Sequence, residues 1–302
     1  MSAPLTTTPS ARPAAHLVIG GAGFVGSHLT DALLAQGHTV VVLDDLSTGE
    51  RANLAAAWPD PRLRFVRGSA LDERLLDELV SRCEVVVHLA AERASPAVVE
   101  AAHRHGRRLL LVTGDAGAAE ASAGACGGEA YGGACGGEAY GGAVTVARLD
   151  HTVGPRQSSA HGALLPRLAE QAVAGLPLTI HGDGNRRLRL THVADTVDAL
   201  LRLLAKADAV GGAFDVGGEW ETAVADLAGV VVERSGSPSP LRFVPYEYEG
   251  EGEEVGEPVP DTRRLRELTG WRPRLGLADI VDAALVDAGG AFGVVTTAKV
   301  GA

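Results

Sequence analysis

Glycine residues near the amino terminus have the spacing of a site for a phosphate-bearing ligand. Residues 17–26 read LVIGGAGFVG, so an apolar stretch runs directly into a glycine-rich turn. Gly20 permits a tight turn, Gly23 lets the backbone approach a pyrophosphate, and Gly26 lets the following helix pack closely. The helix N-terminus would then direct amides and the positive end of its dipole at phosphates. We therefore expect a dinucleotide to bind here.

An acidic residue further along indicates which dinucleotide. Residues 40–44 read VVVLD and place Asp44 at the end of a second apolar stretch. A carboxylate at this place accepts hydrogen bonds from the hydroxyls of the adenosine ribose and repels a 2′-phosphate. The sequence thus predicts NAD rather than NADP.

Alternating apolar and helical patterns describe the elements that would position these residues. We expect helices over 27–36, 72–81, 97–105, 163–174 and 191–204, and strands over 17–19, 40–44, 63–67, 85–90, 109–113, 144–149 and 213–216. A further strand and turn are expected over 178–184. This alternation predicts an α/β fold with a doubly wound parallel sheet, the Rossmann arrangement, followed by a smaller α/β cap.

These patterns also predict how the chain is divided. We expect a disordered leader over 1–15 and a nucleotide-binding domain over 16–175, to which the chain returns around 191–218. The remainder, 176–302, would mainly form the cap.

Composition excludes several classes of partner. The chain has 302 residues and a formal net charge of −11, which disfavours nucleic acids and anionic membranes as partners. No apolar run reaches the roughly 18 residues of a membrane span. The three cysteines have neither metal-site spacing nor an even disulfide framework, so we expect no metal, a reducing compartment and a cytoplasmic location.

Residues 126–134 form a glycine-rich repeat unit, because an identical copy follows at 135–143. Eight of these eighteen residues are glycine. At about 1 kcal/mol for each glycine relative to alanine, an isolated helix here would carry a penalty of about 8 kcal/mol. We expect no stable isolated helix in this segment.

Several separated motifs resemble one family. They are the glycine turn, DDLSTG at 44–49, GSALD at 68–72, HLAA at 88–91, VGPRQ at 153–157, GDG at 182–184, THVAD at 191–195 and VPD at 259–261. Together they resemble the extended short-chain dehydrogenases that act on nucleotide sugars, and most of all bacterial UDP-glucuronate decarboxylases. The resemblance implies that NAD contacts Gly20, Gly23, Phe24, Val25, Gly26, Asp44, Asp45, Ser47, Thr48, Gly49, Ser69, Ala70, Leu89, Ala90 and Ala91.

The resemblance also implies a chemistry, from which this chain departs. In the family, NAD takes a hydride from C4 of the sugar, and a tyrosine with a lysine four residues on acts as base. The candidates here are Thr113, the nearest hydroxyl, Asp115, which stands in the usual place of the catalytic hydroxyl, and Tyr131. No lysine follows Tyr131, since the chain's lysines are Lys206 and Lys299. A tyrosine with a pKa of ~10 is about one-thousandth ionised at pH 7, so proton abstraction should be slow unless an arginine such as Arg148 substitutes.

The implied substrate contacts are altered as well. The family's diphosphate-binding arginine falls on Leu188, so Arg187 or Arg189 would have to replace it, unless both are simply exposed on an edge strand. Arg156 belongs to the VGPRQ motif, and His151 stands where relatives carry asparagine. His151 is either a hydrogen-bonded structural residue or an acid or base.

Several functions stay open on this basis. The first is oxidative decarboxylation of UDP-glucuronate to a UDP-pentose, with 4-epimerisation or 4,6-dehydration of a nucleotide sugar as alternatives. The second is a weak or inactive relative that binds NAD and a nucleotide sugar as a partner or sensor. A third is that the repeat is a local error of frame or duplication in an otherwise typical chain. The helices that pair across the usual family dimer are shortened, which puts that dimer in doubt.

Overall fold

A computed structural model describes residues 14–89, 95–114, 144–159, 163–245 and 260–291. The chain divides into two compact units, each assembled from separate segments. Unit 1 comprises Met1–Leu149, Val197–Val216 and Asp261–Trp271, and unit 2 comprises Asp150–Thr196, Gly217–Pro260 and Arg272–Ala302. The first division therefore falls directly after Leu149, whereas the sequence analysis placed it at 175.

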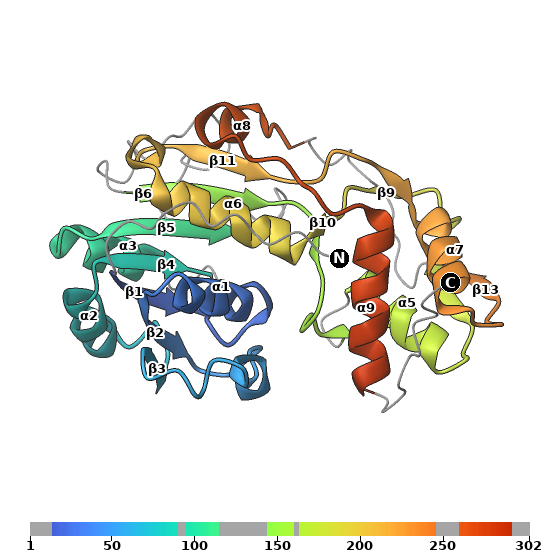
Figure 1. The fold of residues 1–302 in the computed structure, drawn as a ribbon, viewed down its shortest axis with the longest axis horizontal. Coiled ribbons are helices and arrows are strands. Elements are labelled where there is room, and N and C mark those ends of the chain that lie inside the picture. Colours follow the sequence, from blue (N-terminus) through green and yellow to red (C-terminus); the bar gives the residue numbers. More distant parts are fainter. Residues whose placement is uncertain (1–13, 90–94, 115–143, 160–162, 246–259, 292–302) are drawn as a thin grey trace. The chain divides into compact units, whose positions relative to one another are not determined.

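Unit 1 is built on a parallel sheet of seven described strands in the order β11-β6-β5-β4-β1-β2-β3 (Figure 1). Neighbouring strands pair in parallel throughout. The strands are β1 (Ala15–Ile19), β2 (Thr39–Asp44), β3 (Leu63–Arg67), β4 (Val85–His88), β5 (Arg108–Thr113), β6 (Val144–Leu149) and β11 (Ala213–Val216).

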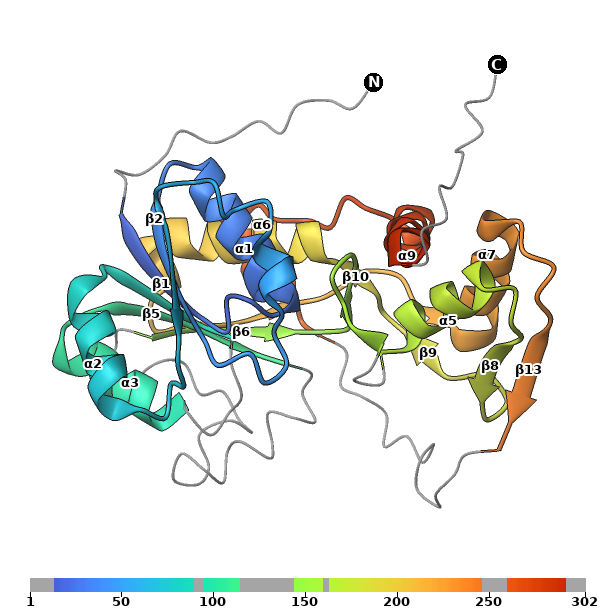
Figure 2. The ribbon, with the colours of Figure 1, turned by 90° about the horizontal axis from the view of Figure 1, so that it is seen from below.

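Helices cover both faces of this sheet. Figure 2 shows α1 (Phe24–Ala35) and α6 (Val193–Ala205) on one side, and α2 (Glu73–Arg82) and α3 (Ser95–Arg104) on the other. Successive residues of a strand face opposite sides, so Leu17 and Ile19 pack with Leu76 of α2 and Val98 of α3. The described part of the unit also contains three short helices: η1 (Arg51–Leu54), η5 (Ala207–Ala209) and α8 (Arg263–Thr269).

Within the described residues, unit 2 contains three helices and three short strand pairs. Its helices are α5 (Leu164–Val173), α7 (Val224–Ser235) and α9 (Leu277–Ala291). The strands β7 (Thr152–Val153), β8 (Leu178–His181), β9 (Arg187–Leu188), β10 (Thr191–His192), β12 (Thr222–Ala223) and β13 (Leu241–Val244) pair as β7 with β10, β8 with β13 and β9 with β12. A separate core of apolar side chains, which includes Leu168, Ile180, Leu227 and Val281, holds the helices and strands together.

The predicted α/β class and doubly wound parallel sheet are confirmed. Most expected elements form within one or two residues of the predicted bounds, although α1 begins three residues before its predicted start, at Phe24. Thr191 and His192 form β10 and the helix begins at Val193, where the Ala194 amide donates to His192 Nδ1 at 3.0 Å. The strand and turn expected over 178–184 are both present: β8 ends at His181, and Gly182 and Gly184, with φ of 75° and 78°, turn the chain.

Two further expectations can be compared with the structure only over the residues that it describes. In the ranges that it describes, no helix is both long and apolar enough to cross a bilayer. The glycine-rich repeat and residues 1–13 of the expected leader lie outside the described residues, whereas Ala15, expected in the leader, begins β1.

Candidate functional site

The glycine turn after β1 is so tight that side chains cannot be added to it. Gly20 has a φ of 80°, and a Cβ on Gly26 would lie 2.1 Å from the Gly20 carbonyl oxygen. A Cβ on Gly21 would meet the Val42 side chain at 2.8 Å. Gly26 is therefore required by the turn itself, whereas the sequence analysis assigned it to packing of the helix on the sheet. The need for Gly21 was missed.

The glycine turn leads into α1, whose N-terminus is not neutralised by any acidic side chain of its own first turn. Gly23 is its N-cap residue and supplies no side-chain cap, and the first turn of α1 contains no acidic residue. The first amides of a helix lack partners within the helix, and the helix dipole adds positive potential there. This end of α1 can therefore receive a phosphate group.

Asp44 is tied into the same turn. Its Oδ2 accepts a hydrogen bond from the Ala22 amide and its Oδ1 from the Leu46 amide, both at 2.9 Å. The side chain is buried, with the residue 7% exposed. Each carboxylate oxygen has a second lone pair, so the group can still accept from a hydroxyl of a ligand. The acid thus shapes the turn as well as being the expected ribose contact.

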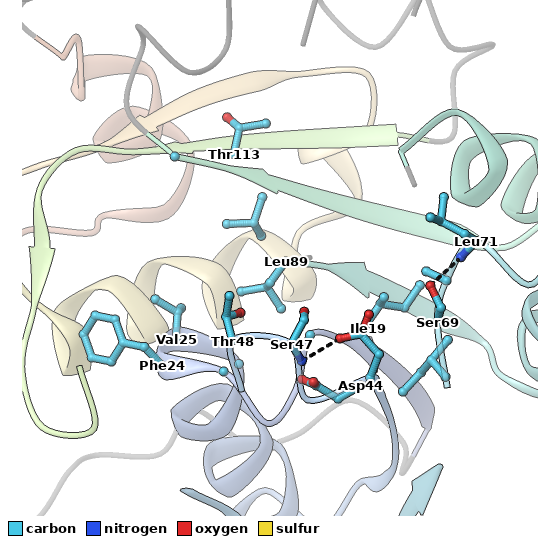
Figure 3. A pocket seen from close by; sticks show the side chains of 18 of the residues that line it. Ile19, Phe24, Val25, Asp44, Ser47, Thr48, Ser69, Leu71, Leu89 and Thr113 are labelled. Atoms are coloured by element: carbon cyan, nitrogen blue, oxygen red, sulfur yellow. Dashed lines mark hydrogen bonds between the residues drawn. The ribbon is translucent and has the colours of Figure 1, made fainter. Parts of the chain in front are cut away.

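A cavity of about 450 Å³ lies beside the turn (Figure 3). Most residues that the sequence analysis assigned to NAD line it: Gly20, Gly23, Phe24, Val25, Gly26, Asp44, Asp45, Ser47, Thr48, Ser69, Ala70 and Leu89. The lining also includes residues that the analysis missed, namely Ile19, Leu43, Gly68, Leu71, Val112, Gly114 and Leu149. Apolar residues at the ends of predicted parallel strands could have identified several of these.

The loop after β2 is held against the turn by hydrogen bonds. The Ser47 amide donates to Asp45 Oδ1 at 2.9 Å, and hydrogen bonds from Ser47 lower the pKa of the Asp45 carboxyl. Asn53 Nδ2 donates to the Ala22 carbonyl oxygen at 2.9 Å. A Cβ on Gly49 would lie 3.0 Å from both Asp44 oxygens, so Gly49 supports the acid although it is outside the cavity lining.

Of the three predicted catalytic residues, the structure places Thr113. It ends β5 and lines the cavity, and within the described part of the chain its buried Oγ1 has no hydrogen-bond partner. Asp115 and Tyr131 lie outside the described residues, as do Ala90 and Ala91 of the expected NAD contacts.

Arg148, which could supply the missing cation, lies opposite Thr113 on the neighbouring strand. The register pairs Thr113 with Arg148 and Arg148 with Asp215. Arg148 Nε donates to Asp215 Oδ1 at 2.5 Å, and Asp215 Oδ2 accepts from the Asp261 amide at 2.8 Å. The Arg148 guanidinium is thus held by a carboxylate at the end of the sheet.

The two candidate diphosphate-binding arginines converge on one carboxylate. Leu188 points into the core of unit 2, so Arg187 and Arg189 face the other way. Arg187 Nε lies 3.1 Å from Glu221 Oε2, and Arg189 pairs with Oε1 of the same residue. Glu221 was missed by the sequence analysis, because only the β9–β12 pairing brings it opposite Arg189.

The segment after β6 contains the other two candidate substrate contacts. His151 Nδ1 lies 2.8 Å from Asp150 Oδ1, and the Arg156 amide donates to Asp287 Oδ2 at 3.1 Å. Both His151 and Arg156 have a positive φ, of 33° and 67°. His88 is fully buried in β4, and burial lowers its pKa to about 4. No group of side chains within the described ranges could hold a metal ion.

Comparison with known proteins identifies a family. The sequence profile of the NAD dependent epimerase/dehydratase family matches residues 16–113 and 136–217. A UDP-glucuronic acid decarboxylase of Arabidopsis thaliana is 29% identical over 86% of this chain, which spans 65% of the length of that plant relative. A UDP-glucose 4-epimerase of Mycolicibacterium smegmatis is 31% identical over 87% of this chain and 95% of its own length.

Solved structures agree with this relationship. A dTDP-glucose 4,6-dehydratase from Streptomyces venezuelae, solved with NAD and TYD bound, is 26% identical and superposes with a TM-score of 0.78 over 91% of this chain and 98% of its own. A UDP-glucose 4-epimerase from Thermotoga maritima, 23% identical over 92% of this chain and 99% of its own, has the same fold with a TM-score of 0.78.

The residues of the turn fit the cofactor that the family uses. A cradle without Cβ atoms, an uncapped helix N-terminus and a buried carboxylate lie together at one cavity. The expected resemblance is confirmed: this chain belongs to the NAD dependent epimerase/dehydratase family.

Proposed function

We propose that this chain is an enzyme that binds NAD in the cavity of unit 1 and uses it to modify a nucleotide sugar. The observation that carries the proposal is the cavity itself, which is lined by the glycine turn, the start of α1 and Asp44. The family relationship supports the same cofactor and the same class of substrate.

The reaction we favour is oxidative decarboxylation of UDP-glucuronate to a UDP-pentose, either UDP-xylose or its 4-keto form. Relatives named as UDP-glucuronic acid decarboxylases support this choice. Relatives named as a UDP-glucose 4-epimerase and a dTDP-glucose 4,6-dehydratase make epimerisation and dehydration the alternatives.

Different residues of the chain bind the cofactor, orient the sugar and bind its diphosphate. When bound, NAD supplies the hydride acceptor of the reaction. The α1 amides receive the pyrophosphate, and Asp44 accepts from the adenosine ribose. Thr113, whose Oγ1 lacks a partner among the described residues, orients a sugar hydroxyl, and Arg187 or Arg189 binds the substrate's diphosphate.

A second candidate function rests on two specific observations. No lysine stands four residues after Tyr131 or Tyr140, and Glu221 already pairs with both Arg187 and Arg189. These features favour a weak or inactive relative that binds NAD and a nucleotide sugar as a partner or sensor.

One experiment separates the two functions. The purified protein is incubated with UDP-glucuronate or UDP-glucose, the sugar products and carbon dioxide are followed by NMR, and bound dinucleotide is measured after denaturation. We expect carbon dioxide from UDP-glucuronate and co-purified NAD. Saturable NAD binding without turnover of either sugar would support the sensor, and a UDP-galactose product from UDP-glucose would support the epimerase.

An Asp44→Ala variant tests the cofactor site separately. It removes the acceptor for both the ribose and the Ala22 and Leu46 amides, so we expect it to lose most of the bound NAD. The matched control is Asp60→Ala, which removes a carboxylate paired with Arg62 in the same unit. Equal NAD retention in the two variants would contradict the assigned site.

A further inference from the structure

Ala22 lies in the middle of the glycine turn, and the segment 44–53 holds both of its backbone polar groups. The Ala22 amide donates to Asp44 Oδ2 at 2.9 Å. The Ala22 carbonyl oxygen accepts from the Glu50 amide at 3.0 Å and from Asn53 Nδ2 at 2.9 Å. All of these residues belong to unit 1. The turn is therefore held from both ends of this segment.

The middle of the same segment lines the cavity. Asp45, Ser47 and Thr48 are among the lining residues, and Figure 3 shows Ser47 and Thr48 beside Asp44. Asn53 is partly buried and is not one of the lining residues. Its bond to Ala22 is made by the amide nitrogen, because a carbonyl oxygen only accepts hydrogen bonds.

The Ala22 carbonyl matters for the cavity because it shares a planar peptide unit with the Gly23 amide. The two groups of a trans peptide point in opposite directions, so a donor that fixes the carbonyl also fixes the amide. The Gly23 amide donates to the Gly20 carbonyl oxygen at 3.1 Å and closes the turn directly before α1. Glycine has no Cβ to restrict the rotation of this peptide unit, so the restriction comes from its hydrogen bonds.

The short helix η1, which carries Asn53, is itself anchored. Leu54, the next residue, is fully buried. The Arg51 guanidinium lies over the rings of Trp58 and Phe65, with its central carbon 5.1 and 5.7 Å from the ring centres. Such cation–π contacts are favourable even at exposed positions. Asn53 is thus presented to the turn from a fixed element.

We propose that Asn53 is a positioning residue for NAD, which it affects from outside the cavity lining by holding the peptide unit between Ala22 and Gly23. The inference rests on the proposed binding of NAD in the cavity of unit 1. The affinity for NAD then depends on this side chain separately from the stability of the fold.

Two substitutions and a matched control test this role. Asn53→Leu removes the donor, and Asn53→Asp keeps the size of the side chain but turns an acceptor toward the Ala22 carbonyl. The control is Thr145→Val, which removes the hydrogen bond from Thr145 Oγ1 to the Ala209 carbonyl oxygen at 3.1 Å. Thr145 is buried near the start of β6, whereas the cavity residue Leu149 ends that strand.

The first readout is the dissociation constant of NAD, measured by titration calorimetry after removal of any bound dinucleotide. The Glu50 amide still holds the Ala22 carbonyl, so we expect Asn53→Leu to raise the constant by about three- to tenfold, and Asn53→Asp to raise it further. Thr145→Val should lower the melting temperature but keep the constant within about twofold of the wild type, because distant sites act independently.

NMR of the turn without ligand provides the second readout. The carbonyl ¹³C resonance of Ala22 reports on its hydrogen bonds, and the exchange of the Gly23 amide with solvent reports on local opening of the turn. We expect a shifted Ala22 resonance and faster Gly23 exchange in both Asn53 variants. Both signals should stay as in the wild type in Thr145→Val.

The outcomes separate this role from the proposed function. An unchanged affinity for NAD in both Asn53 variants overturns the positioning role and leaves the proposed cofactor site standing. Weaker binding without faster Gly23 exchange, or an equal loss of affinity in Thr145→Val, overturns the positioning role as well. A wild type that binds no NAD overturns the proposed function, and the role of Asn53 with it.

Discussion

The Cβ atom that glycine lacks is decisive at Gly26. In a Gly26→Ala variant the new carbon would lie 2.1 Å from the Gly20 carbonyl oxygen, and the contact is with backbone, which cannot rotate away. We expect the free energy of unfolding to fall by about 2 kcal/mol or more and the bound NAD to be lost. Chemical denaturation and dinucleotide analysis of the purified variant measure both effects.

Gly229→Ala is the matched control for that substitution. Gly229 lies inside α7, and a Cβ there meets nothing within 4 Å. Alanine should stabilise the helix by about 1 kcal/mol because it forms helix more readily than glycine. Similar losses in the two variants would show that the tight turn is not what makes Gly26 necessary.

Site residues that lie on consecutive elements could be predicted from the sequence, whereas contacts between segments distant in the sequence could not. Gly20, Gly26 and Asp44 were identifiable because the strand, turn, helix and strand that carry them are consecutive. The hydrogen bond from Asn53 to the Ala22 carbonyl and the ion pairs of Glu221 each join segments about thirty residues apart. No local pattern in the sequence encodes such contacts.

Helix α2 has the clearest local signal among the elements. Asp72 is its N-cap, and its Oδ1 accepts from the Leu75 amide at 3.1 Å. An Asp72→Ala variant leaves that amide without its cap, so we expect a loss of about 1 kcal/mol in the free energy of unfolding. Urea denaturation measures the loss. Asp72→Ser, which can still cap the helix, should restore most of it, and a full loss in both variants would exclude capping as the cause.

Strand β9 could be expected from the sequence, but which of its two faces is buried could not. The motif at 182–189 indicates a turn and a strand, but a shift of one residue exchanges the two faces of a strand. Leu188 packs inward and leaves the arginines on either side of it directed at Glu221. The inward face is set by the core of unit 2, which includes Leu227 and Val281 from far along the chain.

At the scale of the whole molecule, two buried histidines make stability depend on pH. Burial and the neighbouring His38 lower the pKa of His16 to about 4, and burial alone lowers the pKa of His88 to about 4. Between pH 6.5 and 4 the unfolded chain therefore binds protons that the folded chain excludes. Stability should fall as the pH drops through this range and level off below it, with each histidine contributing about 3 kcal/mol.

Thermal melting at several pH values between 7.5 and 4.5 tests this dependence. A His16→Gln variant should have a shallower loss of stability with acid than the wild type. His103→Gln, at an exposed position on α3, should follow the wild type. Parallel curves for all three proteins would exclude His16 as a source of the acid sensitivity.

Each unit is assembled from three separate stretches of chain. The edge strand β11 and the fully buried Trp271 of unit 1 come from its second and third stretches. During synthesis, more than sixty residues are therefore added after β6 before β11 exists to cover its outer edge. An uncovered edge is open to pairing with other chains. For the same reason, a single crossover within the gene cannot exchange one intact unit for that of a relative.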